Sequence, residues 1–352
     1  MQTTVDIKIR SSQAKSNKLQ RSHTNVFVVA LVSSTLLSMF MATWLPLQVS
    51  VVTVFLFAGP HNWFEFRYFL TRLPLRFGKS RNFFLTALAG IAVLTSLYVL
   101  LPLLYGFRSW TFDGWSVVIA SWNSLFLAWL GGLIWLRNKQ KSGSDWTWLA
   151  PILLAVAALN WLAPAVFSLA LVYLHPLVAL WFLDRHLKRT RPEWLRAYRS
   201  FLCLLPFFIA SMIWQLSRTA GLPDDNGLFW RITQHSGADL FPGVSSHMLV
   251  SVHLFLEMLH YGVWVIALPL IVPTTRNQPS LTKSFWNVKS VPLARHPRGF
   301  PRLILSSLAV AAVFVVVLWV GFSIDYETTR DLYFTVAMAH VLAEAPFLLK
   351  ML

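Results

Sequence analysis

Residues 251–270 read SVHLFLEMLHYGVWVIALPL, and this stretch decides the fold class of the chain. It contains no lysine or arginine, and its apolar residues continue for about the 20 positions that a helix needs to cross a bilayer. At about 100° per residue, His253, Glu257 and His260 fall on one narrow face of that helix. Because a polar face is costly against lipid, we expect it to point into a helix bundle or a cavity.

Nine further apolar runs occur along the chain, so the sequence predicts an all-α, polytopic transmembrane bundle of about ten helices. Of the 352 residues, 56% are hydrophobic and only 12% are charged, whereas a soluble domain carries about 25% charged residues. We expect a basic cytosolic tail at residues 1–24 and one transmembrane domain at residues 25–352. The predicted helices are 25–45, 46–66, 82–105, 115–136, 146–161, 162–184, 198–216, 243–273, 302–323 and 332–350.

The distribution of cations predicts how this bundle is oriented. Short cytoplasmic loops are enriched in Lys and Arg, and a cytoplasmic N-terminus places 26 of the 30 cations on the cytoplasmic side. With ten helices the C-terminus is then cytoplasmic as well. We expect a multi-pass protein of a cell membrane, in particular a bacterial inner membrane, whose basic loops contact anionic lipids. The sequence contains no nucleic-acid-binding module, so a nucleic acid is not an expected partner.

Histidine and glutamate are paired inside the apolar runs. Three of the five glutamates lie four residues after a histidine, as His61/Glu65, His253/Glu257 and His340/Glu344. Residues at i and i+4 are neighbours on a helix, and ionisable pairs at bilayer depth indicate a functional site. Gly59 and Pro60 precede His61, so we expect the helix to break there and His61 to begin a half-helix beside a cavity, with an ordinary proline kink as the alternative.

The side chains in these positions favour a metal site. Imidazole and carboxylate without sulfur suit iron, zinc or manganese, and the single cysteine, Cys203, excludes a thiolate-rich centre. We predict Fe²⁺, with zinc or manganese as alternatives. The predicted metal ligands are His61, His175, His253, His260 and His340.

Three carboxylates are the candidate catalytic residues, because each could bind the metal or accept the second N–H of a ligating imidazole. They are Glu65, Glu257 and Glu344. A proton relay or metal-free substrate site, and a buried structural polar network, are the alternative interpretations. Four histidines in polar or basic segments are interpreted as surface residues: His23, His186, His235 and His296. Whether Asp184 or His247 belongs to the site stays open.

The order of these polar residues resembles the Brp/Blh family, membrane proteins that cleave β-carotene to retinal and are thought to use histidine-bound iron. Gly59-Pro60-His61 followed by Glu65 is similar to the family's Gly-x-Pro-His-x3-Asp station in an early helix. The later stations resemble His175 with Asp184, His253 with His260, and His340 with Glu344. The chain departs from the family by having Glu for Asp at two stations and a spacing of seven at the third.

The leading functional hypothesis is therefore an integral membrane, non-haem iron oxygenase. Its expected partners are O₂ and a hydrophobic small molecule taken from the bilayer, such as a carotenoid, another isoprenoid or a lipid. The resemblance supports an embedded oxygenase more than it supports carotene cleavage. A divalent-metal or proton-coupled transporter with a site at the membrane midplane is the alternative, and a haem-binding subunit with paired axial histidines is a third possibility.

Overall fold

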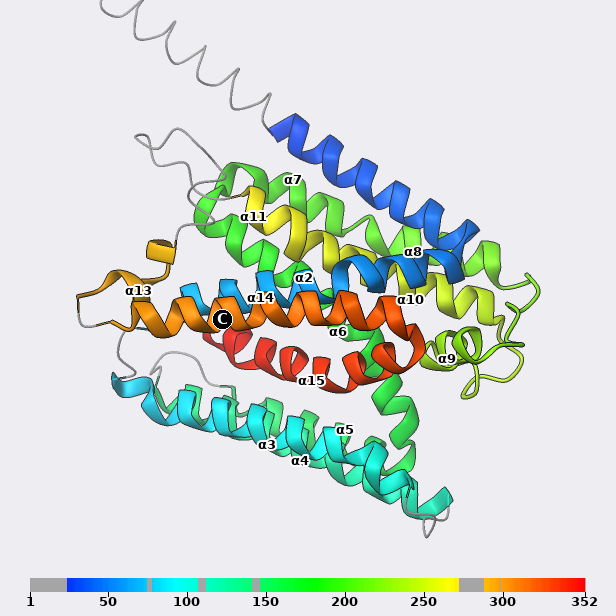
Figure 1. Ribbon diagram of the computed structural model, residues 1–352, viewed down its shortest axis with the longest axis horizontal. Helices are drawn as coiled ribbons and strands as arrows, with labels where there is room; N and C mark the ends of the chain where they lie inside the picture. The colour runs from blue at the N-terminus through cyan, green and yellow to red at the C-terminus, as the bar shows by residue number, and fades with distance from the viewer. Residues whose placement is uncertain are drawn as a thin grey trace, which may run out of the picture.

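The computed structural model describes residues 24–74, 78–106, 112–140, 146–271, 288–297 and 299–351. Within these ranges every regular element is helical and no strand occurs. The long helices run side by side, and α3, α4 and α5 form a layer beside the others (Figure 1). The all-α prediction is confirmed.

Each of the ten apolar runs coincides with helical structure. The long helices are Thr24–Trp44, α2 (Pro46–Arg72), α3 (Arg81–Gly106), α4 (Phe112–Gln140), α6 (Pro164–Thr190), α14 (Pro301–Ile324) and α15 (Tyr326–Met351). Shorter helices are α5 (Leu149–Leu162), α7 (Pro192–Leu202), α8 (Leu205–Leu216), α9 (Gly227–His235), α10 (Ser246–Tyr261), α11 (Leu268–Leu270) and α13 (Pro292–Arg295). Two short 3₁₀-helices are η1 (Gly78–Ser80) and η3 (Val288–Ser290), and η2 (Gly262–Ala267) is a π-helix.

Eight helices of the described chain are long and apolar enough to cross a membrane, which makes the chain a multi-pass membrane protein. The count treats α7 with α8, and α10 with η2, as single spans. Two of the ten predicted segments fall outside it. Helix α2 has 27 residues, but polar residues such as His61, Asn62 and Glu65 interrupt its apolar run; α5 has 14 residues, about 21 Å of helix. The number ten and the cytoplasmic termini stay predictions.

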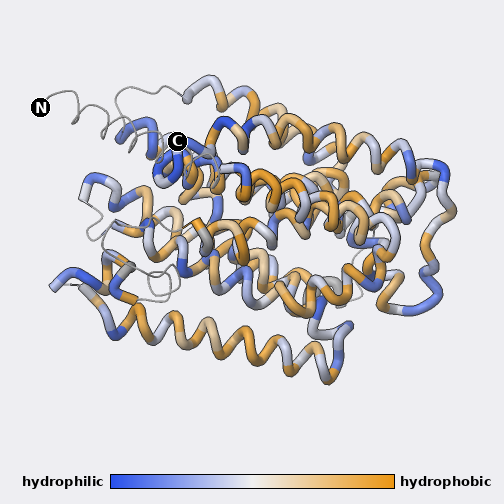
Figure 2. Tube along the Cα trace, turned by 90° about the horizontal axis from the view of Figure 1, so that it is seen from above, coloured by the Kyte–Doolittle hydropathy of each residue, from blue (hydrophilic) through white to orange (hydrophobic). Residues whose placement is uncertain are grey.

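Helix α10 lies at the centre of the bundle, and α14 lies at its edge. In the apolar window of Ser246–Ala267, 72% of the residues are buried, against 22% in Pro301–Ile324. Helix α10 contacts α2, α6 and α8, while α14 exposes large apolar side chains such as Leu303 and Val310. Hydrophilic residues gather toward the helix ends (Figure 2). The polar face of α10 is therefore turned into the bundle, as the sequence predicts.

The prediction that the second helix breaks at Pro60 is wrong. Helix α2 continues through Pro60, and α6 and α15 continue through Pro176 and Pro346. A proline inside a helix removes one backbone hydrogen bond, and neighbouring side chains can satisfy the carbonyls that such a bend frees. His61 Nδ1 donates to the carbonyl oxygen of Phe57 at 2.9 Å in this region. The helix continues through the proline as a single segment.

The helix that carries His253 and His260 changes geometry directly after them. Residues 262–267 form a π-helix, η2, between α10 and α11. Such wide turns occur mainly as local insertions in α-helices, frequently at functional sites. Trp264 of η2 is 1% exposed, and its ring centroid lies 6.4 Å from that of His260. The wide turn therefore lies against the polar centre of the bundle.

A glycine sets the packing of the α3–α4 layer. A Cβ added at Gly90 would lie 1.9 Å from Nε1 of Trp129. That indole donates to the carbonyl oxygen of Thr86 at 3.0 Å, so the ring cannot move without losing its hydrogen bond. Gly132 in the same layer has no heavy atom within 4 Å of an added Cβ.

Replacing Gly90 with leucine should therefore destabilise the α3–α4 packing by about 1–3 kcal/mol. Thermal unfolding of the detergent-purified protein should show a lower midpoint for Gly90→Leu. The matched variant Gly132→Ala should unfold at or slightly above the wild-type temperature, because alanine has the higher helix propensity. An unchanged midpoint for Gly90→Leu would contradict the close approach of Trp129.

Candidate metal centre

Four histidines from four helices meet inside the bundle. His61 lies on α2, His175 on α6, His260 on α10 and His340 on α15. The ring centroids of His175 and His260 are 4.7 Å apart, and those of His61 and His340 are 5.1 Å apart. Further pairs lie at 5.0 Å, 5.4 Å and 6.2 Å. Side chains separated by up to 279 positions thus form one cluster.

The orientation of His61 is fixed by its own helix. Its Nδ1 donates to the carbonyl oxygen of Phe57, one turn earlier. The proton on Nδ1 leaves the lone pair on Nε2, and this buried atom has no hydrogen-bond partner among the described residues. A ligating histidine commonly holds its tautomer in this way, by donating its other nitrogen to a carbonyl or carboxylate. His61 is 1% exposed, so its free nitrogen faces the cluster and not solvent.

The carboxylate of Glu344 fixes the orientation of His175. Its Oε2 lies 3.0 Å from Nδ1 of His175, and the proton on Nδ1 again leaves the lone pair on Nε2. That atom lies 3.2 Å from Nε2 of His340. Two nitrogens bound tetrahedrally to one metal at about 2.0–2.1 Å would be about 3.3 Å apart. The separation of the two Nε2 atoms fits two ligands of one ion, and it is also the length of an N–H···N hydrogen bond between the two rings.

The cluster concentrates buried polar atoms that lack partners. Such atoms are rare in folded proteins and costly in an apolar interior. Among the described residues, the atoms without a hydrogen bond here are His61 Nε2, both ring nitrogens of His260, His340 Nδ1, both oxygens of Glu65 and Glu344 Oε1. All of them are nitrogen or carboxylate oxygen atoms, which are the donors that iron, zinc and manganese take. A bound cation would satisfy them together.

Two sets of potential ligand atoms lie within 4.8 Å of one another. One set contains His61, Glu65, His260 and His340, and the other contains His175, His260 and Glu344. His260 belongs to both, which makes the two sets one continuous centre. Its size accommodates a single ion or a bridged pair, since paired metals lie about 3.5–4 Å apart. The donor set therefore fits a metal ion.

The structure does not bring His253 and Glu257 into these sets. His253 precedes His260 by seven residues, or about 10 Å along the helix axis, so one ion cannot bind both. The His253 ring instead packs beside His235 and Tyr173, at centroid distances of 5.2 Å and 5.4 Å. Glu257 accepts a hydrogen bond from the hydroxyl of Tyr261 at 2.7 Å. His253, Glu257 and His260 share one face of α10, but they lie at different depths in the bundle.

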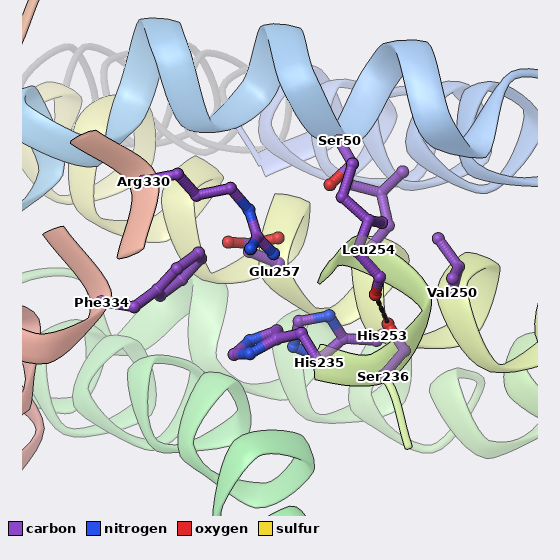
Figure 3. A pocket seen from close by; sticks show the side chains of 10 residues that line it. Ser50, His235, Ser236, Val250, His253, Leu254, Glu257, Arg330 and Phe334 are labelled. Carbon is purple, nitrogen blue, oxygen red and sulfur yellow. Dashed lines mark hydrogen bonds between the residues drawn. The ribbon is translucent and has the colours of Figure 1, made fainter. Parts of the chain in front are cut away.

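His253 and Glu257 line a second polar cavity toward the other end of α10. Figure 3 shows the guanidinium of Arg330 reaching toward Glu257 and the rings of His235 and His253 side by side. The cavity leaves about 10 Å³ for the centre of a water molecule, which is room for about one ordered water. Burial lowers the pKa of the His235 imidazole well below its usual range, and nearby His253 and Arg330 lower it further. His235 is therefore neutral.

Two tyrosines with hydrogen-bonded hydroxyls, Tyr261 and Tyr333, lie between the cavity and the metal centre. Tyr261, which donates to Glu257, also packs on His61 with ring centroids 4.5 Å apart. Tyr333 accepts from the side-chain amide of Asn62 at 3.1 Å. The sequence analysis missed Tyr261, Tyr333 and Arg330. A helical pattern on α15 could have revealed two of them, because residues 330, 333, 337, 340 and 344 share one face.

The remaining histidines have varied environments. The interpretation of His186 as a surface residue is wrong, because it is 8% exposed and its ring nitrogens approach Arg72 and the carbonyl of Ile271 at 3.3 Å. His235 is half-buried against Phe334, so its surface assignment is also wrong. His296 is exposed, and His23 lies outside the described residues.

The two undecided residues lie apart from the metal centre. Asp184 forms a two-point ion pair with Arg199, at 2.8 Å and 3.2 Å. Nε2 of His247 lies 2.8 Å from the carbonyl oxygen of Thr43. Neither residue belongs to the sets of potential ligands.

No protein-family model, curated protein or solved structure matches this chain significantly. What the centre can do therefore follows from its own geometry. Its nitrogen and oxygen donors converge from four helices and include two carboxylates, and all but His175 and His340 are fully buried. This arrangement is suited to holding a transition metal away from water.

Substituting His260 and His253 separately should distinguish the metal centre from the second cavity. We expect His260→Ala to remove most of the bound metal, because His260 belongs to both ligand sets. The matched change His253→Ala, on the same helix, should leave the metal content near that of the wild type. Metal analysis of the detergent-purified variants measures this, and equal loss in both would contradict the separation of the two clusters.

Replacing Glu344 with glutamine should test its contact with His175. Glutamine keeps an acceptor for Nδ1 but removes the charge, and loss of such a contact typically weakens metal binding by about 10- to 100-fold. Competition with a chelator measures the affinity. Glu257→Gln is the control, since Glu257 is equally buried but lies outside the ligand sets; a larger effect there than at Glu344 would count against the assignment.

Proposed function

We propose that this protein is a membrane-embedded metalloenzyme that oxidises a lipid-soluble substrate at a histidine-bound iron centre. The observation that carries the proposal is the convergence of four imidazoles and two carboxylates inside an apolar helical bundle, where all but His175 carry a buried atom without a hydrogen bond to the described residues. Polar groups this costly to bury are retained in membrane proteins mainly where they serve a site.

The histidines and the glutamates contribute differently to binding the ion. His61, His175, His260 and His340 supply neutral nitrogen ligands, and Glu65 and Glu344 bring two negative charges. A divalent cation with two carboxylates forms an assembly without net charge, which lowers the cost of burial in an apolar medium. The backbone of Phe57 and the carboxylate of Glu344 hold two imidazoles in the tautomer that ligation needs.

Iron, when bound, would supply the O₂ chemistry that protein side chains cannot perform. The chain's own contribution is a dry and rigid surrounding. His61, Glu65, His260 and Glu344 are each 2% exposed or less, and the apolar helices around them exclude water from the reacting groups. A membrane-dissolved substrate would reach such a site from the bilayer.

The order of the histidines adds support for this substrate class. One histidine from each of the four segments that resemble the Brp/Blh family contributes to the cluster: His61, His175, His260 and His340. Carotenoids and other isoprenoids are therefore the first substrates to test.

The test combines metal analysis with lipid analysis. Purified wild-type protein should contain iron at about one or two ions per chain, as the size of the centre requires. Membranes that contain the wild type should form a new oxidised lipid when supplied with O₂, and membranes that contain His260→Ala should not. Protein purified without any transition metal would overturn the proposal. So would uptake of the metal into proteoliposomes without any oxidised product, the behaviour of a transporter.

A further inference from the structure

A basic cavity lies at the ends of α3, α4 and α15, and none of the residues that line it belongs to the metal centre. Its volume is about 230 Å³, and it is lined by Ser80, Phe83, Arg137, Gln140 and Lys350. The lining contains two cations, a hydroxyl and an amide, and no carboxylate of the described residues belongs to it. These groups donate hydrogen bonds, so the cavity is built for an anion with several acceptor oxygens.

Arg137 is held in place without an ion pair among the residues that the structure describes. It is 6% exposed, and its guanidinium carbon lies 4.6 Å from the ring centroid of Trp146. Its Nη1 is buried without a hydrogen-bond partner, and no carboxylate of the described ranges forms an ion pair with it. A buried guanidinium with an unused donor is costly. An anionic ligand in the cavity would remove that cost.

Lys350 approaches the same cavity from α15. Its Nζ donates to the hydroxyl of Ser80 at 3.0 Å and lies 4.9 Å from the ring centroid of Phe84. Ring and hydroxyl hold the ammonium in place, while the ion pairs among the described residues do not include it. Lysine binds phosphate as a compact charge, and arginine binds it through a planar pair of donors.

The surroundings of the cavity suit a lipid. Phe83 forms an apolar wall, and α3 continues from it with exposed side chains, Leu85 at 47% and Leu88 at 52%. A phosphate in the cavity would thus lie at the end of a helix whose outward face, which carries Leu85 and Leu88, offers an apolar surface to acyl chains. Basic pockets between transmembrane helices, near the membrane surface, take anionic headgroups in this way.

We propose that the cavity binds the phosphate headgroup of an anionic phospholipid, through Arg137 and Lys350. This site is independent of the metal centre and of the proposed enzymatic function. It is built by residues at the ends of three helices, so an occupied site would also tie the α3–α4 layer to α15.

The experiment titrates the full-length protein, in a neutral detergent, with phosphatidylglycerol and follows binding by native mass spectrometry. The double variant Arg137→Gln/Lys350→Gln should bind this lipid roughly thirty-fold more weakly, from the attraction of two cations to an anionic headgroup. Phosphatidylcholine should bind the wild type and the double variant equally. The control Lys139→Gln should behave as the wild type, because Lys139 is an exposed residue of α4 outside the cavity.

Two further measurements keep the outcome clear. The metal content of the double variant should equal that of the wild type, which shows that the bundle is folded. Lys350→Arg should retain binding, because the charge is preserved. Equal affinity of the folded double variant for phosphatidylglycerol would overturn the proposal. Displacement of the lipid by millimolar inorganic phosphate would overturn the lipid assignment, because the ligand would then be free phosphate.

Discussion

The structure depends on one constraint, the cost of placing imidazole and carboxylate groups in an interior that offers no water. Four histidines and two glutamates occupy the meeting point of α2, α6, α10 and α15. Only a partner that accepts nitrogen and oxygen donors from all sides can satisfy so many atoms at once. This requirement points to a cation, and it explains why the most buried of the candidate spans carries the centre.

Hydrogen bonds to the imidazole rings give the centre its rigidity. The carbonyl of Phe57 and the carboxylate of Glu344 each hold one imidazole by its Nδ1. The π-helical segment after His260 brings Trp264 against the centre, and Tyr261 joins it to the second cavity. Because these contacts come from the same helices that provide the ligands, the packing of the bundle and the geometry of the centre are not separable. Disturbing one helix would move several donors.

Much of the fold could be predicted from the sequence, because apolar runs and their length report directly on helices in a membrane. All ten predicted segments are helical, although eight satisfy the length and composition of a span. The expected break at Pro60 does not occur, since the sequence shows that a backbone donor is missing but not whether the packed helix continues through that position. The surface assignments of His186 and His235 failed because burial depends on which segments pack together.

The sequence by itself determined that this is a helical membrane protein with histidine and glutamate paired on buried helix faces. Helical periodicity fixes the direction in which His253, Glu257 and His260 point. Only the tertiary structure decided which of them share a centre, because the stagger of neighbouring helices sets the depth at which side chains meet. His260 lies level with His61, His175 and His340, while His253 lies about 10 Å along the axis, with Arg330 and His235. Depth is a property of the assembled bundle, which no single helix encodes.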